Sequence, residues 1–224
     1  QHFATRKRTL EYDDVMNKQR ATIYELRRNI LLTEDSRGML LDYIYTAVAE
    51  RVESAFAARP RHESLDLSAV QSWLSRTIPI GFAKEIFAHD SSPDALSQAI
   101  MDRIEEAYRL KEQIEGGESL RWLERYIMLN ALDNLYQEHL YAMDSLRQGV
   151  QLRSYGQRDP LVEYKQEAYK LFSDLMEAIK DDICSSIFRY SSMTQEQAEA
   201  LLAKNAREQA ERGKSSPTVE IHQS

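Results

Sequence analysis

The sequence predicts an all-α protein. Glycine and proline together make up about 5% of the 224 residues, less than half of their usual combined share of about 12%. Apolar residues recur at three- and four-residue spacing over several long stretches, as on one face of a helix. No useful length of sequence shows the alternation of apolar and polar residues typical of a strand. These observations predict long helices joined by few turns.

The first helix is predicted from Thr5 to about Leu32, because apolar residues follow one face of it and only the polar Gln19 interrupts them. Thr33, Asp35 and Ser36 break this helix and cap a second one. The second helix runs to about Phe56 and stops before Pro60, since the residue preceding a proline avoids helical dihedrals.

The middle of the chain, residues 59–117, is acidic and holds three of the five prolines, which predicts short, broken helices. Ser68 is predicted to cap a short helix that ends at Ile78 and Pro79, and another short, turn-rich helix is expected at residues 82–87. Ser92 and Pro93 are a stronger start signal, an N-cap followed by proline at the first helical position. Gly116 and Gly117 are expected to close that helix.

Two long helices follow. Residues 118–148 contain no proline or glycine and predict a helix of about 45 Å at about 1.5 Å per residue. After a polar loop at residues 151–159, Asp159 and Pro160 start a second long helix that reaches about Ile187. Facing apolar stripes and a short joint predict an antiparallel hairpin. In the tail, a capping box at residues 194–197 predicts a modest helix to about Arg212, followed by a disordered end.

Composition excludes several classes of function. No apolar run approaches the roughly 20 residues needed to cross a bilayer, and the first residues lack the apolar core of a signal peptide, so neither spanning nor secretion is expected. The single cysteine, Cys184, excludes an internal disulfide and any site with several thiolates. The net charge of −7 disfavours nucleic-acid binding.

No pattern in the chain indicates an active site. The phosphate-binding motifs GxxxxGK[ST] and GxGxxG and the metal-binding motif HExxH are absent from the sequence. The acidic run of Glu11, Asp13 and Asp14 is interpreted as a solvated helix face. His139 is interpreted as a partly buried residue of the helix pair, and Cys184 as inert core.

The loop QGVQLRSYGQRD, residues 148–159, is the exception. It places Arg153, Tyr155, Gln157 and Arg158 at the end of a long lever, where we expect no core that would bury the tyrosine ring. A phenol ring covers peptide groups without requiring one sequence, and arginines add hydrogen-bond donors. The loop is therefore a candidate contact surface with Tyr155 exposed; the alternative is a turn tyrosine packed on its own loop.

Three stretches resemble one known family. LEYDDVMNKQR at residues 10–20, PIGFAKEIF at 79–87 and the long segment 132–172, which contains LRQGVQLRSYGQRDP, look like the C-terminal third of SecA, the preprotein-translocating ATPase of bacteria. The resemblance covers roughly residues 3–190. It implies a helical scaffold at residues 1–58, a helical wing at 59–118, the scaffold's continuation with the two-helix finger at 119–190, and a tail at 191–224.

In that family the tip of the two-helix finger enters the cytoplasmic mouth of the SecYEG channel and touches the translocating chain. The resemblance matches the tip tyrosine to Tyr155. Beside it, Leu152, Arg153, Gln157 and Arg158 are the expected contacts with polypeptide or channel.

The resemblance also implies cofactors and partners. Both nucleotide-binding domains of the family lack a match here, so we expect a fragment that begins inside the scaffold helix, without ATPase activity of its own. ATP and magnesium would be bound by those domains, and zinc is not expected, since Cys184 is alone. The implied partners are SecYEG, preprotein, and the nucleotide-binding and preprotein-crosslinking domains of the same parent chain, with a possible homodimer and no nucleic acid. The implied location is cytoplasmic, peripheral to the inner membrane.

Two other readings remain open. One is a free-standing helical scaffold that dimerises through the hairpin faces and has no substrate. The other is an RNA-binding arm using Arg147, Arg153 and Arg158, although three arginines are few on an acidic chain. We also expect the apolar stripe of the first helix to lack part of its cover in this chain and to drive self-association; the residues concerned are Tyr12, Val15, Ile23 and Leu26.

Overall fold

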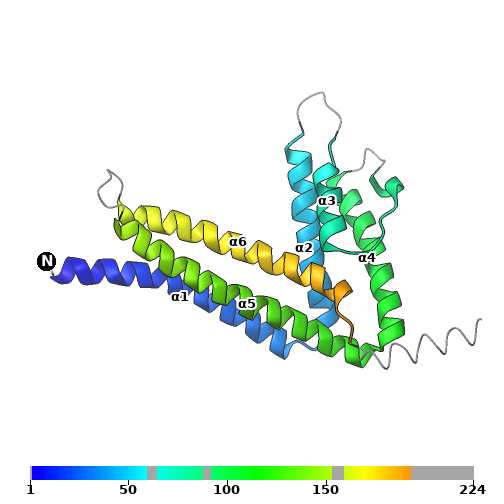
Figure 1. The fold of residues 1–224 in the computed structure, drawn as a ribbon, viewed down its shortest axis with the longest axis horizontal. Coiled ribbons are helices and arrows are strands. Elements are labelled where there is room, and N and C mark those ends of the chain that lie inside the picture. The colour runs from blue at the N-terminus through cyan, green and yellow to red at the C-terminus, as the bar shows by residue number, and fades with distance from the viewer. Residues whose placement is uncertain (1, 60–64, 88–91, 153–158, 193–224) are drawn as a thin grey trace, which may run out of the picture.

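The structure, a computed structural model, describes residues 2–59, 65–87, 92–152 and 159–192, and within them it contains helices and no strands (Figure 1). The all-α fold class is therefore confirmed. In chain order the elements are α1 (His2–Leu32), α2 (Ser36–Ala57), α3 (Ser68–Thr77), the 3-10 helix η1 (Lys84–Phe87), α4 (Pro93–Glu115), α5 (Gly117–Leu152) and α6 (Pro160–Arg189).

The helices form an L. In Figure 1, α1, α5 and α6 lie side by side as one long arm, and α2, α3 and α4 stand at one end of it, roughly across its direction. We call that end the base. At the other end, the distal end, α1 begins, α5 finishes and α6 starts. The helices α5 and α6 pack along their lengths in opposite directions, and the residues between them, 153–158, lie outside the described residues, as does the predicted tail helix.

Three predicted helix starts are confirmed by their cap geometry. The carboxylate of Asp35 accepts a hydrogen bond from Gly38 N at 2.8 Å, and Ser92 Oγ accepts one from Ala95 N at 3.2 Å, ahead of Pro93. Asp159 Oδ1 accepts one from Leu161 N at 3.0 Å. Each cap satisfies a backbone N–H that has no partner inside the helix.

Other predicted boundaries are wrong. Ser68 does not cap α3; it is the first helical residue, and its N–H donates to Asp66 Oδ1 at 2.8 Å. Gly117 starts α5 rather than closing α4, because Gly116 alone, at φ 86°, makes the left-handed turn between them. The helix α5 also continues through Gly149 to Leu152, since the completely buried Val150 outweighs the modest cost of an interior glycine.

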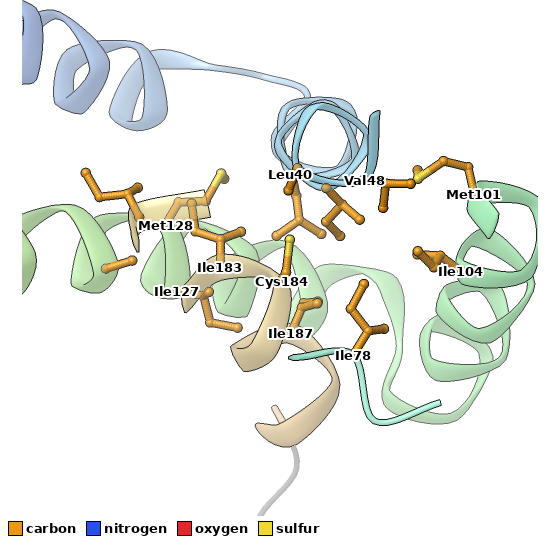
Figure 2. Packing of buried hydrophobic residues seen from close by; sticks show 14 of the residues in the cluster. Leu40, Val48, Ile78, Met101, Ile104, Ile127, Met128, Ile183, Cys184 and Ile187 are labelled. Atoms are coloured by element: carbon orange, nitrogen blue, oxygen red, sulfur yellow. The ribbon is translucent and has the colours of Figure 1, made fainter. Parts of the chain in front are cut away.

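The main core lies at the base, where α2, α4, α5 and α6 meet. Figure 2 shows buried side chains from these four helices and from the segment after α3 pointing toward one centre, among them Leu40, Ile104, Ile127 and Ile187. Cys184 is part of this core and completely buried, as the sequence predicts. Burial raises the pKa of its thiol to about 12, so the thiolate is not formed near neutral pH.

A buried carboxylate joins three elements at the base. Glu124 of α5 is fully buried and accepts hydrogen bonds from the hydroxyls of Ser36, at the start of α2, and Tyr108, in α4. The pKa of Tyr108 is raised above its ordinary range, mainly by burial and secondly by the neighbouring Glu124. The hydroxyl therefore remains a donor. Next to it, Arg125 Nη2 donates to Thr33 O at 2.8 Å, at the end of α1. These contacts fix the corner of the L.

The stripe on α1 that we expect to lack part of its cover is buried at Ile23 and partly buried at Tyr12, Val15 and Leu26. Ile23 and Ile30 are 1% exposed and belong to the main core, and Leu26 packs against it. Tyr12 and Val15 pack against a second cluster at the distal end. The stripe is covered because α1 lies against both α5 and α6, whose apolar faces are wide enough for two neighbours. The stripe is thus largely covered within the chain, and self-association through it stays a prediction.

Candidate functional site: the distal end of the helix pair

The predicted contact residues themselves cannot be placed. Arg153, Tyr155, Gln157 and Arg158 lie outside the described residues, so the exposure of Tyr155 stays a prediction. Leu152 is the last residue of α5, and its side chain is likewise outside the description. The structure describes the frame on both sides of these residues, which is where their support must come from.

The distal end has a small core of its own on the helices that flank residues 153–158, and whether it reaches Tyr155 lies outside the described residues. Five residues of α5 and α6 are buried in it: Met143, Leu146, Val150, Tyr164 and Ala168. Tyr12 of α1 packs against them, with its ring centroid 4.7 Å from that of Tyr164. Tyr164 is 1% exposed, and burial raises the pKa of its hydroxyl. The ends of α5 and α6 on either side of residues 153–158 thus belong to a packed three-helix end.

An ion pair ties α1 to α5 beside this core. Arg147 Nη1 lies 3.1 Å from Asp13 Oδ1, and the guanidinium carbon is 5.9 Å from the centre of the Tyr12 ring. Both charged side chains are partly exposed, at 39% and 46%. Asp13 thus lies on a solvated helix face, as interpreted from the sequence, and also has an ion-pair partner there. Arg147 already has an acidic partner, which weakens the RNA-binding hypothesis that needs it as a phosphate contact.

A buried polar bridge lies further along the arm. Gln19 is 6% exposed, and its amide Nε2 donates to Ala168 O of α6 at 3.0 Å. On its other side, His139 Nε2 of α5 lies 2.9 Å from Gln19 Oε1. His139 is 5% exposed, more buried than the sequence indicates, and its ring packs edge-on against Phe172 at 5.8 Å between centroids. Burial lowers the pKa of His139, which keeps the imidazole neutral at neutral pH.

A groove opens between α1 and α5, between the bridge and the base. Its walls include Ile23, Tyr24, Leu31 and Leu32 of α1 and Tyr136 of α5, and its volume is about 680 Å³. Tyr24, Leu31 and Leu32 are 59%, 51% and 67% exposed. The charged Arg27, Arg28 and Asp133 complete its lining. The exposed apolar part of this mixed surface is of the kind that marks contacts with other proteins.

Sequence reasoning missed part of this arrangement. The single polar residue on the first apolar stripe, Gln19, was a signal that its partners lie on another helix. Nothing in the sequence indicates that these partners would be His139 and the backbone at Ala168. Within the described ranges no group of three or more His, Cys, Asp or Glu side chains is arranged to hold a metal ion. No helix in those ranges combines the length and apolarity required to cross a membrane.

Comparison with known proteins identifies the family. The model of the SecA wing and scaffold domain matches residues 1–191. The chain is 39% identical over 213 residues to the protein translocase subunit SecA of Chlorobaculum tepidum, covering 93% of this chain and 20% of that protein. It is 38% identical to the SecA subunit of Heliobacterium modesticaldum (84% of this chain, 22% of that protein) and 38% identical to that of Koribacter versatilis (81% and 18%). The chain thus spans about a fifth of the length of these relatives, and it belongs to the SecA wing and scaffold domain family.

Proposed function

We propose that the chain works as the scaffold, wing and two-helix finger of a SecA-type motor, in which it transmits ATP-driven movement of nucleotide-binding domains to a preprotein in the SecYEG channel. It does so by mechanical coupling rather than by bond chemistry. The observation that supports this proposal is the attachment of α1 to the helix pair, which extends from the base to the distal end.

The attachment recurs at three levels of the arm. Arg27 of α1 pairs with Asp133 of α5 at 3.0 Å, Gln19 reaches His139, and Asp13 pairs with Arg147. From residue 27 to residue 13 these levels cover about 20 Å of helix, at about 1.5 Å per residue. Apolar side chains of α1 fill the space between them. A force applied to α1 would therefore be carried to the distal end by three packed helices rather than by α1 alone.

The same proposal assigns the partners. We propose that the groove at Tyr24, Leu31 and Leu32 receives other domains of the parent chain. These are the preprotein-crosslinking domain and the nucleotide-binding domains, and the nucleotide-binding domains would also bind ATP and magnesium. A motor acting on SecYEG would lie at the cytoplasmic face of the inner membrane. Calorimetric titration of this chain with ATP tests the assignment, because a saturable, stoichiometric signal would contradict it.

The decisive experiment concerns Tyr155. In the full-length motor, Tyr155→Ala is expected to abolish or sharply reduce preprotein translocation, while Tyr155→Phe and Tyr155→Trp retain much of it, since the aromatic face supplies most of the contact area. Arg153→Ala and Arg158→Ala should have weaker, salt-sensitive effects.

The matched control is Tyr169→Ala, because Tyr169 is a 77% exposed tyrosine on α6 away from the joint. This variant should translocate normally. If Tyr155→Ala also translocates at the normal rate, the proposed function is wrong. The helix pair then acts only as structural support, which leaves the free-standing or dimerising scaffold.

A further inference from the structure

Gln19 is the one described side chain of α1 that is both polar and buried, and it contacts both helices of the pair. The residues on either side of it along the α1 stripe are apolar: Val15 and Met16 lie one turn before it, and Ile23 lies one turn after it. After a shift of one turn an apolar stripe still meets apolar side chains, at a cost in packing. A buried amide would also lose its hydrogen-bond partners, because these occupy fixed positions.

The bridge has a defined polarity. A backbone carbonyl can only accept hydrogen bonds, so the nitrogen of the Gln19 amide must face Ala168 O. The amide oxygen then faces His139, and His139 Nε2 must carry the proton that it donates. If α1 moved by one turn, the hydrogen bond between the Gln19 amide and the buried His139 N–H would break, and an apolar side chain would face the imidazole.

We propose that Gln19 is a positioning residue that fixes the register of α1 against α5 and α6 together, so that the two helices follow α1 as one body. The proposal rests on the function proposed above. The ion pairs at Arg27 and Arg147 are partly exposed, and an exposed pair tolerates small shifts because water replaces its partner. At the base, Arg125 holds the end of α1 at Thr33 O. Along the arm, the buried bridge is the described polar contact that tolerates no shift, and it therefore sets the register of the distal part of α1.

The test must separate register from stability. Gln19→Leu alone leaves the buried His139 N–H without a partner and would weaken folding for that reason only. The double variant Gln19→Leu/His139→Leu removes both polar groups and replaces them with apolar ones, which is often close to neutral for stability. Gln137→Leu is the matched control, the same chemical change at an exposed position of α5 two residues from His139.

The first measurement is a spin-label distance between Asn17 of α1 and Lys170 of α6, both exposed positions changed to cysteine; the native Cys184 is buried. The wild type and Gln137→Leu should each give one narrow distance. The double variant should unfold at the same temperature within about 3 °C yet give a broad or two-peaked distribution. A distribution as narrow as that of the wild type would overturn the proposal.

The second measurement is preprotein translocation by the full-length motor. The double variant is expected to lose about fivefold or more of the wild-type rate, in the range of typical coupling between sites. A broadened distance with an unchanged rate would also overturn the positioning role. Neither result depends on Tyr155, whose own variants decide the proposed function.

A measurement on the wild type needs no variant. The ¹⁵N shifts of the His139 ring should show a neutral imidazole with its proton on Nε2 at neutral pH, as the donation to Gln19 requires. A proton on Nδ1 would mean that the bridge does not exist as described, and the proposal would fail.

Discussion

The base and the distal end use the same two helices, α5 and α6, but support them differently. At the base the pair packs against α2, α3 and α4, and the buried cluster there draws on α1 as well. At the distal end, among the described residues, only α1 joins the pair, and five of them form the buried core. Because local opening becomes easier where fewer apolar contacts hold the chain, the distal end should open at a lower free energy than the base. The end proposed to touch the preprotein is thus the more weakly packed end. Its stability depends more on each single contact than the stability of the base does.

The largest expected difference comes from removing one buried apolar side chain at each end. Ile183→Ala at the base should lower the free energy of unfolding by about 2–5 kcal/mol, since Ile183 is completely buried in the main core. Hydrogen exchange should then become faster in every described helix. Met143→Ala, which removes a residue that is 1% exposed, should speed exchange mainly near the distal end. Equal and global effects of both changes would contradict the comparison.

A second test removes a polar joint at the base. Arg51 Nη2 lies 2.7 Å from both carboxylate oxygens of Asp181, and Trp73 Nε1 donates to Asp181 Oδ1 at 3.2 Å. Asp181→Ala should cost about 1–3 kcal/mol in chemical denaturation, because two donors lose their acceptor. Asp181→Asn, which keeps an acceptor, should cost less. Asp174→Ala, an exposed carboxylate of the same helix, is the control and should change little.

A third test uses pH at the buried bridge. Burial holds the pKa of His139 below its ordinary value, so the unfolded chain takes up a proton there before the folded chain does. The contribution of this residue to stability is therefore full above the ordinary histidine pKa, about 6.5, and falls as pH drops below it. Between pH 7.5 and 5.5 the wild type should lose more stability in urea than the Gln19→Leu/His139→Leu variant. Equal losses of stability in the wild type and in the variant would show that protonation of His139 does not cause the pH dependence.

The smallest effects are expected from the exposed ion pairs along the arm. Asp133→Asn breaks the pair with Arg27, whose side chains are 44% and 48% exposed, and should change stability by about 0.5 kcal/mol or less, with the difference lost in high salt. Asp13→Asn at the distal end should behave alike. If Asp13→Asn lowered the free energy of unfolding much more than Asp133→Asn does, the stability of the distal end would depend on charge more strongly than the exposure of the pair indicates.

The helices and most of their ends could be predicted from the sequence because the signals are local. Asp35, Ser92 and Asp159 cap helices through hydrogen bonds to backbone two or three residues away. The start of α3 was misplaced because Ser68 and Asp66 compete as signals two residues apart. The end of α5 was misplaced because Gly149 has a small intrinsic cost that the burial of its neighbour Val150 outweighs.

The sequence by itself determined the all-α class, the positions of the long helices and the face of each that is apolar, since these follow from spacing and composition. Only the tertiary structure decided which faces meet. The covering of the α1 stripe by both α5 and α6, the joint of Ser36 and Tyr108 at Glu124, and the bridge from Gln19 to His139 all join residues far apart in the chain. A helical period places a residue on a face and leaves open what that face touches, because partners 120 residues away along the chain are selected by packing and by the cost of leaving buried polar groups unpaired.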